Sequence, residues 1–237
     1  MKKLFCFLSE HRYFYRLLLL VPVLVWFRIL EHSLTPVYMT QTALDRQIPF
    51  LPVFVVPYLL WFAYIAYGVL YTGIHSKEDF CRLLVFLGGG MTVANLMFGL
   101  FPNAQGLRPE ITAGDSFSLL VKFIYDTDTP TNVCPSVHVI NALAVDAALR
   151  HSDAFAKKRF GRAASLIFTA LVCLSTVFIK QHAVLDVFCG FAVAALFYIP
   201  LYVLPARRSD AGNSPGRGGT EMPLRRSKYS GKFPNEP

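Results

Sequence analysis

The sequence has few charged residues for its length. Only 16% of its 237 residues are charged, whereas soluble domains usually carry about 25%. Hydrophobic residues make up 54% of the chain and aromatic residues 14%. Too little charge is available to cover a water-facing surface, and too much apolar surface is present for a disordered chain. We therefore expect an all-α integral membrane protein.

Clustered cysteines and a nucleotide-binding loop are also missing. The five cysteines stand singly, without a C-x-x-C pair, which excludes a disulfide framework or a zinc site. Gly88, Gly89 and Gly90 lie inside an apolar stretch, and no Lys-Ser or Lys-Thr follows them. Close helix packing explains these glycines better than a phosphate loop does. We expect no cofactor.

Six stretches are apolar enough to be membrane helices, which need about 20 residues each. The weakest is the fourth, because polar residues interrupt it. The six are Tyr13–Glu31, Phe50–Thr72, Cys81–Phe101, Pro135–Ser152, Arg162–Lys180 and Val184–Leu204. They predict a six-helix bundle in residues 1–205, followed by a disordered basic tail in residues 206–237.

The net charge of +8 indicates how the bundle is oriented. With both termini inside, eighteen of the 23 Lys and Arg residues fall on the inner side. This predicts an N-in, C-in protein, expected in the plasma membrane. The basic charge then indicates topology and membrane lipids as partners, not nucleic acid. The tail either contacts anionic headgroups or is simply solvated.

Three polar clusters fall on the predicted outer side, where ionisable residues at helix ends are functional candidates. The first is Arg108, in a connection that also contains an apolar, interfacial helix candidate at Phe117–Tyr125. The second is the segment from Cys134 to His138. The third contains Lys180, His182 and Asp186. The clusters place an active site at the extracytoplasmic ends of the fourth and sixth helices.

The third cluster predicts an activated histidine. His182 and Asp186 are four residues apart, so on a helix they share one face and can form a hydrogen bond. A carboxylate on one ring nitrogen fixes the tautomer and leaves the other nitrogen free to attack an electrophile.

The second cluster predicts an anion site. Pro135 suits a first helical turn, so the amides of Ser136, Val137 and His138 would point toward an anion at a helix N-terminus. His138 can also protonate a leaving group. Positive charge for the remaining oxygens would come from Arg108 and Lys180.

Asp126 and Asp128 form a D-x-D pattern that either binds a metal or serves as turn residues before a helix. The turn interpretation is favoured. No other part of the chain has the ligand count of a dedicated metal site, so no metal is expected. Asp146 and Arg150 are spaced as an ion pair on one helix.

These residues resemble the type 2 phosphatidic acid phosphatase superfamily, which includes the vanadium haloperoxidases. Its motifs are roughly K-x6-R-P, P-S-x-H and S-R-x5-H-x3-D. Here they read Phe101…Arg108-Pro109, Pro135-Ser136-Val137-His138 and Ser175-Thr176…His182…Asp186. The resemblance implies that His182 forms a phosphohistidine, Asp186 orients it and His138 is the general acid. Arg108 and Ser136 would hold the phosphate.

The chain departs from these motifs at two positions, because Phe101 replaces the Lys and Thr176 replaces the Arg. Lys180 could supply part of the lost charge. The expected function is metal-independent hydrolysis of a lipid phosphate or diphosphate, of the phosphatidic acid or prenyl diphosphate kind. The alternatives are a lipid phosphotransferase of the inositol phosphoceramide synthase type and a non-catalytic protein that binds lipid phosphate.

Overall fold

A computed structural model describes residues 11–112 and 114–204. The described chain is mostly helical, with one very short pair of strands. The helices are η1 (Arg12–Leu19), α2 (Leu20–Ser33), α3 (Ala43–Gln47), η2 (Pro52–Phe54), α4 (Val55–His75), α5 (Lys77–Leu100), α6 (Ser116–Thr127), α7 (Val137–His151), α8 (Asp153–Ala156), α9 (Arg159–Phe178), α10 (Val184–Tyr198) and η3 (Ile199–Val203). The strands are β1 (Tyr38–Met39) and β2 (Asn103–Ala104).

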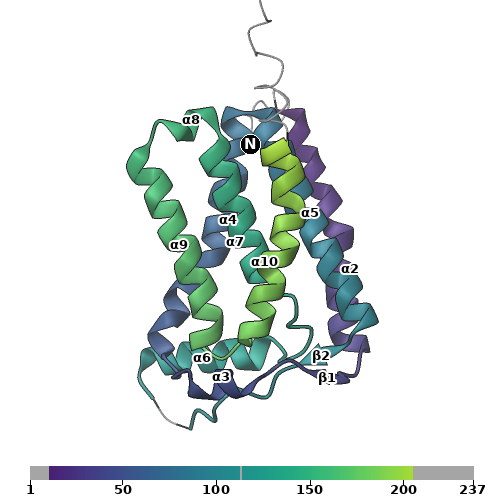
Figure 1. The fold of residues 1–237 in the computed structure, drawn as a ribbon, viewed down its shortest axis with the longest axis vertical. Coiled ribbons are helices and arrows are strands. Elements are labelled where there is room, and N and C mark those ends of the chain that lie inside the picture. Colours follow the sequence, from purple (N-terminus) through teal and green to yellow (C-terminus); the bar gives the residue numbers. More distant parts are fainter. Residues whose placement is uncertain (1–10, 113, 205–237) are drawn as a thin grey trace, which may run out of the picture.

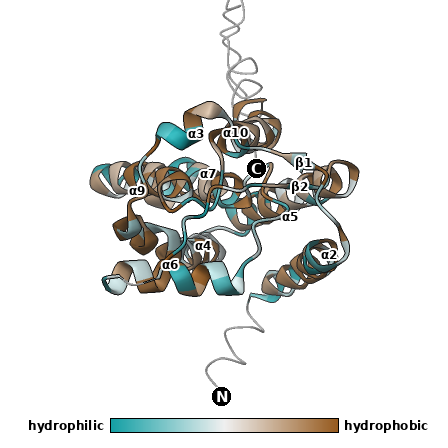
Figure 2. Cartoon of the chain, turned by 90° about the horizontal axis from the view of Figure 1, so that it is seen from below, coloured by the Kyte–Doolittle hydropathy of each residue, from teal (hydrophilic) through white to brown (hydrophobic). Residues whose placement is uncertain are grey.

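Five helical stretches in the described part are long and apolar enough to cross a membrane. They are Arg12–Ser33, Pro52–His75, Lys77–Leu100, Arg159–Phe178 and Val184–Val203. Large apolar side chains are exposed along the bundle, as a lipid environment requires, and Figure 2 shows that hydrophobic residues predominate along the long helices. Five of the six expected spans are therefore confirmed as candidates, whereas the full six-span topology and its orientation remain predictions.

The expected fourth span corresponds to α7, which has only 15 residues. This helix lies at the centre of the bundle and packs against α4, α5, α9 and α10 (Figure 1). Most of its side chains are buried, including four alanines at Ala142, Ala144, Ala147 and Ala148. The polar residues that interrupt its sequence are tolerated because protein surrounds the helix.

Glycines allow the neighbouring helices to approach α7 closely. A Cβ at Gly90 would lie 2.6 Å from the side chain of Ile140, and a Cβ at Gly68 would lie 2.6 Å from that of Val145. The helix-packing interpretation of the glycines in α5 is thus confirmed. The ion pair expected in α7 is also present, with Arg150 Nε 3.6 Å from Asp146 Oδ2.

One end of the bundle carries β1, β2, α3 and α6, and we call it the sheet end (Figure 1). The strands pair in parallel, Tyr38 with Asn103 and Met39 with Ala104. The helix expected at Phe117–Tyr125 is present as α6, capped by Asp115, whose side chain accepts from the amides of Phe117 and Ser118. The predicted tail lies outside the described residues.

Candidate active site

The site is built around His182, which lies at the sheet end in the turn between α9 and α10. The backbone amides of Gln181 and His182 both donate to the carbonyl of Thr176, at 2.9 and 3.0 Å. These bonds fold the turn back onto the end of α9. His182 is buried, with only 7% of its surface exposed, so its ring has a fixed environment.

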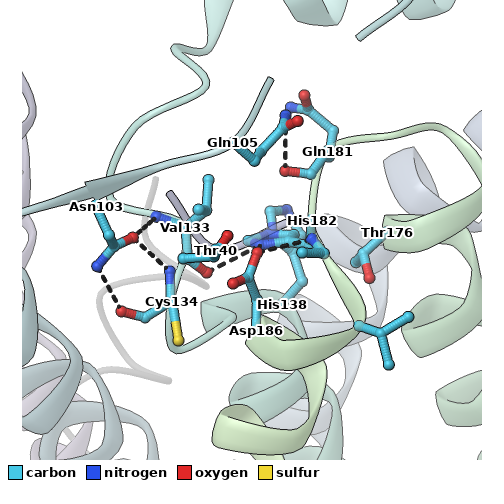
Figure 3. Close-up of polar contacts among 12 residues, drawn as sticks. Thr40, Asn103, Gln105, Val133, Cys134, His138, Thr176, Gln181, His182 and Asp186 are labelled. Carbon is cyan, nitrogen blue, oxygen red and sulfur yellow. Dashed lines mark hydrogen bonds and ion pairs between the residues drawn. The ribbon is translucent and has the colours of Figure 1, made fainter. Parts of the chain in front are cut away.

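The ring of His182 is held through Nδ1, which lies 3.0 Å from the carbonyl oxygen of Val133. A carbonyl oxygen can only accept a hydrogen bond, so Nδ1 carries the proton and Nε2 keeps its lone pair. The nearest carboxylate oxygen, Asp186 Oδ2, is 3.5 Å from Nδ1. The prediction placed His182 and Asp186 on one helix, but His182 precedes α10. The two side chains nevertheless lie next to each other (Figure 3).

Asp186 is fully buried and lies in the first turn of α10. Its Oδ2 accepts from the amide of Ala183 at 2.8 Å, which caps the helix, while its Oδ1 has no hydrogen-bond partner in the described part of the chain. The backbone carbonyl of Asp186 accepts from the amide of Ser136 at 3.0 Å. Asp186 therefore links the start of α10 to the start of α7. One residue thus positions both the segment that carries His182 and the segment that carries His138.

His138 faces His182 across the site. Its Nδ1 lies 3.3 Å from Nε2 of His182, which is the free nitrogen. The ring of His138 packs between Tyr58 and Trp61 of α4, with centroid separations of 4.5 and 4.4 Å. Trp61 also donates from Nε1 to the backbone carbonyl of His138 at 3.1 Å. Two aromatic rings thus fix the second histidine, a role that the sequence motifs do not indicate.

The carbonyl of Val133 is itself positioned by Asn103, a buried residue of β2. Asn103 Oδ1 accepts from the amides of Val133 and Cys134, both at 2.9 Å. Its Nδ2 donates to the carbonyls of Cys134 and Phe101, at 2.9 and 2.8 Å. Figure 3 shows this network beside the histidines. The sequence offers one signal for Asn103, which is its position two residues after Phe101 within the first motif.

The anion site expected at the start of α7 differs in two respects from the prediction, in the position of Pro135 and in the partner of the Ser136 amide. The helix begins at Val137, with Ser136 as N-cap, so Pro135 precedes the cap and is not in the first turn. The Ser136 amide is already bonded to Asp186. The amides of Val137 and His138 occupy the first two helical positions, where no intrahelical acceptor exists. Ser136 is fully buried, and its Oγ has no hydrogen-bond partner within residues 11–112 and 114–204.

Arg108 supplies positive charge at the sheet end. Its Nη1 donates to the carbonyl of Tyr125 at 3.1 Å, and the guanidinium lies over the Tyr125 ring, 4.6 Å from the centroid. Nε and Nη2 are buried and have no hydrogen-bond partner among the residues that the structure describes. Burial lowers the pKa of Arg108, while the charge of Asp128 opposes that effect. Two hydrogen-bond donors of a cation are therefore available to an anion.

Lys180 does not show the arrangement expected of a phosphate ligand. Its ammonium donates to the backbone carbonyls of Asp45 and Ile48, at 2.7 and 2.6 Å. The residue is buried and adopts a positive φ of 57°. Its charge is thus directed at α3, and nothing in this geometry supports the expected phosphate contact.

The two positions that depart from the motifs offer no charge either. Phe101 is 48% exposed, immediately after α5. Thr176 is fully buried, and its hydroxyl donates to the carbonyl of Cys173 at 2.8 Å.

The two aspartates of the D-x-D pattern have different neighbours. Asp126 pairs with Lys122 at 3.2 Å on an exposed face of α6. Asp128 instead accepts from the side-chain amide of Gln181 at 2.9 Å. Within residues 11–112 and 114–204, no group of three His, Cys, Asp or Glu side chains could hold a metal ion.

A cavity of about 740 Å³ opens beside His138. Its walls come from η1, α2, α4, α5, α6 and α7, and almost all of the lining side chains are apolar. The ionisable side chains in the lining are Tyr58, Asp128 and His138, which lie toward the sheet end. On α4 the lining extends from Tyr58 to Val69, about 16 Å at 1.5 Å per residue. That length is roughly half the thickness of the hydrocarbon core of a bilayer.

A family model supports the assignment that the motifs suggest. The model of the PAP2 superfamily matches residues 80–210, more than half of the chain. This range contains Arg108, His138, His182 and Asp186. No curated protein and no solved structure matches the chain. Since the family match covers most of the site and of the bundle around it, the chain belongs to the PAP2 superfamily, the type 2 phosphatidic acid phosphatases.

Proposed function

We propose that the protein is a membrane phosphatase that removes phosphate from a lipid phosphate or diphosphate through a phosphohistidine on His182. Members of the superfamily are generally phosphatases, which supports a phosphoester hydrolase. The observation that carries the finer proposal is the separation of 3.3 Å between His182 Nε2 and His138 Nδ1. This short distance supports the proposal, because a histidine with a fixed tautomer can act as a nucleophile when a second group nearby can transfer a proton.

In the first step, Nε2 of His182 attacks phosphorus and forms an N–P bond while the bond from phosphorus to the lipid oxygen breaks. His138 gives its proton to that oxygen, so the lipid leaves as a neutral alcohol or as its remaining phosphate. Asp186, 3.5 Å from Nδ1, stabilises the positive charge that develops on the ring. In the second step, water attacks phosphorus, His138 takes its proton and His182 is regenerated.

The donors without partners provide ligands for the phosphate oxygens. They are Nε and Nη2 of Arg108 and the hydroxyl of Ser136, joined by the Val137 amide at the start of α7. Charge-assisted bonds from a guanidinium are the strongest available here. Lys180, an expected phosphate ligand, is not part of this proposal because backbone carbonyls already engage its ammonium.

The cavity beside His138 supports a lipid as the substrate. Its volume of about 740 Å³ lies within the usual range for ligand pockets, about 300–1,000 Å³. An apolar chain in this cavity would run along α4 while its phosphate stays at the histidines. We propose the predicted N-in, C-in orientation in the plasma membrane, which places the sheet end and the site on the outer side.

Two other functions remain as alternatives. A lipid phosphotransferase would carry out the same first step but would pass the phosphoryl group to an alcohol. A protein that only binds lipid phosphate would keep the ligands without turnover.

The test measures phosphate release from phosphatidic acid and from prenyl diphosphates, in EDTA, by the purified protein in detergent. We expect release by the wild type, inhibition by vanadate and loss of activity in His182→Ala. His75→Ala is the matched control, since His75 lies at the far end of α4, where its Nδ1 is 2.8 Å from the Tyr71 carbonyl and its ring stacks on Tyr71. Equal release by wild type and His182→Ala would refute the proposal, and inactivation by EDTA would restore the metal interpretation of Asp126 and Asp128.

A further inference from the structure

A second cavity lies at the opposite end of the bundle from the sheet end, and the proposed function does not use it. Its volume is about 390 Å³, which is within the usual range for ligand pockets. It forms where α4 ends and α5 begins, and where α7 ends and α8 begins (Figure 1). We call it the α8 cavity, and its lining comes from residues 75–82 and 151–154. Two candidate membrane spans adjoin there, so the cavity lies at a membrane–water boundary.

The lining of the α8 cavity is polar and carries an excess of negative charge. Arg82 is the one Lys or Arg among the described lining residues, and it pairs with Glu78 on the same helix. This ion pair cancels its own charge. Asp79 and Asp153 also line the cavity, and neither forms an ion pair within the described part of the chain. Two carboxylates are therefore left without a cation.

Asp79 is the lining residue that indicates a ligand. It is nine-tenths buried, with 9% of its surface exposed, yet its carboxylate forms no hydrogen bond with any residue that the structure describes. An acidic residue in the first turn of a helix favours the helix dipole, but the cap of α5 is Ser76, whose side chain accepts from the Asp79 amide. A buried carboxylate without a partner is unfavourable. A cation in the cavity would remove that cost.

The other lining groups favour a cation that has several N–H donors. Nδ1 of His151 lies 2.9 Å from the carbonyl of Ala147, so a neutral ring presents Nε2 as an acceptor. Ser152 is fully buried, and its hydroxyl has no hydrogen-bond partner among the described residues. A primary ammonium group brings three donors to such a set of acceptors.

Two other kinds of cation fit the α8 cavity less well. Quaternary ammonium groups are bound by cages of aromatic rings, and no Phe, Tyr or Trp is among the described residues that line the cavity. A metal ion needs several ligands close together. Residues 11–112 and 114–204 contain no group of three His, Cys, Asp or Glu side chains that could hold one. The chemistry of the lining thus matches a primary ammonium group best.

We infer that the α8 cavity is a binding site for a primary ammonium group, which Asp79 and His151 hold. The group belongs either to a lipid headgroup at this membrane surface or to a soluble amine. The inference does not depend on the phosphatase chemistry, because His138 lies at the other end of α7. That helix has 15 residues, which corresponds to about 22 Å at 1.5 Å per residue.

The chain provides a matched control for Asp79 at Asp126. Asp126 lies on an exposed face of α6, at the sheet end, where it pairs with Lys122. Asp79→Asn and Asp126→Asn therefore make the same change in net charge, one inside the α8 cavity and one far from it. Asp153→Asn is a second variant inside the cavity, at the exposed first residue of α8. It decides the test if Asp79→Asn does not fold.

The experiment measures binding to the full chain by calorimetry, at pH 7.5 in an uncharged detergent. Dodecylammonium and dodecyltrimethylammonium have the same charge and chain but differ in N–H donors, while ethanolamine has the donors without the chain. We expect the wild type to bind dodecylammonium about 10-fold more tightly than dodecyltrimethylammonium. Asp79→Asn should lower the affinity for dodecylammonium by about 10-fold or more. Asp153→Asn should lower it by a smaller factor, and Asp126→Asn should leave it unchanged.

The outcomes separate the two sources of the ammonium group. Binding of dodecylammonium without binding of ethanolamine supports a lipid headgroup, and similar affinities for both support a soluble amine. Equal affinities of the wild type for the two amphiphiles would overturn the inference. It would also fail if the affinity for dodecylammonium stayed unchanged in the folded cavity variants, or if Asp126→Asn lowered it as much as they do.

Discussion

Lys180 and Asp45 join the turn that contains His182 to the connection between α2 and α4. The ammonium of Lys180 donates to the carbonyl of Asp45 at 2.7 Å. In return, Oδ1 of Asp45 accepts from the amide of Val184, the first residue of α10, at 2.7 Å. His182 lies between these two anchor points. The fully buried Asp45 and Lys180 thus hold both sides of the turn that carries His182, the proposed nucleophile.

This arrangement predicts that Lys180 is a positioning residue. Lys180→Met should lower kcat about 10-fold or more, because two buried carbonyls lose their donor and the turn shifts. Lys180→Arg keeps a cation and should recover part of the rate. KM should change little, since the ammonium does not contact the phosphate. A large rise in KM with an unchanged kcat would instead support the phosphate contact expected from the sequence.

Removing Asn103 should affect both stability and catalysis. Asn103→Ala deletes four hydrogen bonds around Val133 and Cys134, including those that place the acceptor of His182. We expect a loss of about 2–4 kcal/mol in the free energy of unfolding and a drop in kcat. The control is Asn95→Ala in α5, whose amide donates to Val23 away from the site. Equal losses of activity per folded molecule in the two variants would contradict the role given to Asn103.

The apolar cavity predicts a dependence on chain length. Ala66 of α4 lines the cavity, whereas Ala63 is exposed on the same helix and does not. Ala66→Phe should lower kcat/KM for a lipid substrate with a long chain by about 10-fold and leave a butyl analogue nearly unaffected. Ala63→Phe should change neither. If both variants behave alike with both substrates, the cavity does not hold the apolar chain of the lipid substrate.

The sequence was sufficient to bring the candidate site residues together because their spacing follows local rules. The interval between His182 and Asp186 brought the two together even though His182 precedes the helix. The same holds for the apolar stretches, which set the helices within a few residues of their observed bounds. Residues near each other in sequence have few possible arrangements, so their chemistry could be inferred.

The supporting contacts could not be predicted in this way because they join distant segments. His182 uses the carbonyl of Val133, which any residue type provides, so no side-chain pattern reveals it. Asn103 and Asp45 act across more than twenty residues of sequence. Lys180 was expected at the phosphate because of its place near His182, but its long side chain reaches the carbonyls of another loop. Because the Lys180 side chain is buried, its ammonium needs acceptors within the protein, and these carbonyls provide them.

The most direct test of the central claim is detection of a phosphoryl group on His182 itself. The wild type would be quenched during turnover of a phosphorus-labelled lipid phosphate, digested under alkaline conditions and mapped by mass spectrometry. We expect an acid-labile, base-stable label on the peptide that contains His182, and none in His182→Ala, while His75→Ala is labelled like the wild type. Turnover without any label on that peptide, or with the label on another residue, would contradict the phosphohistidine mechanism.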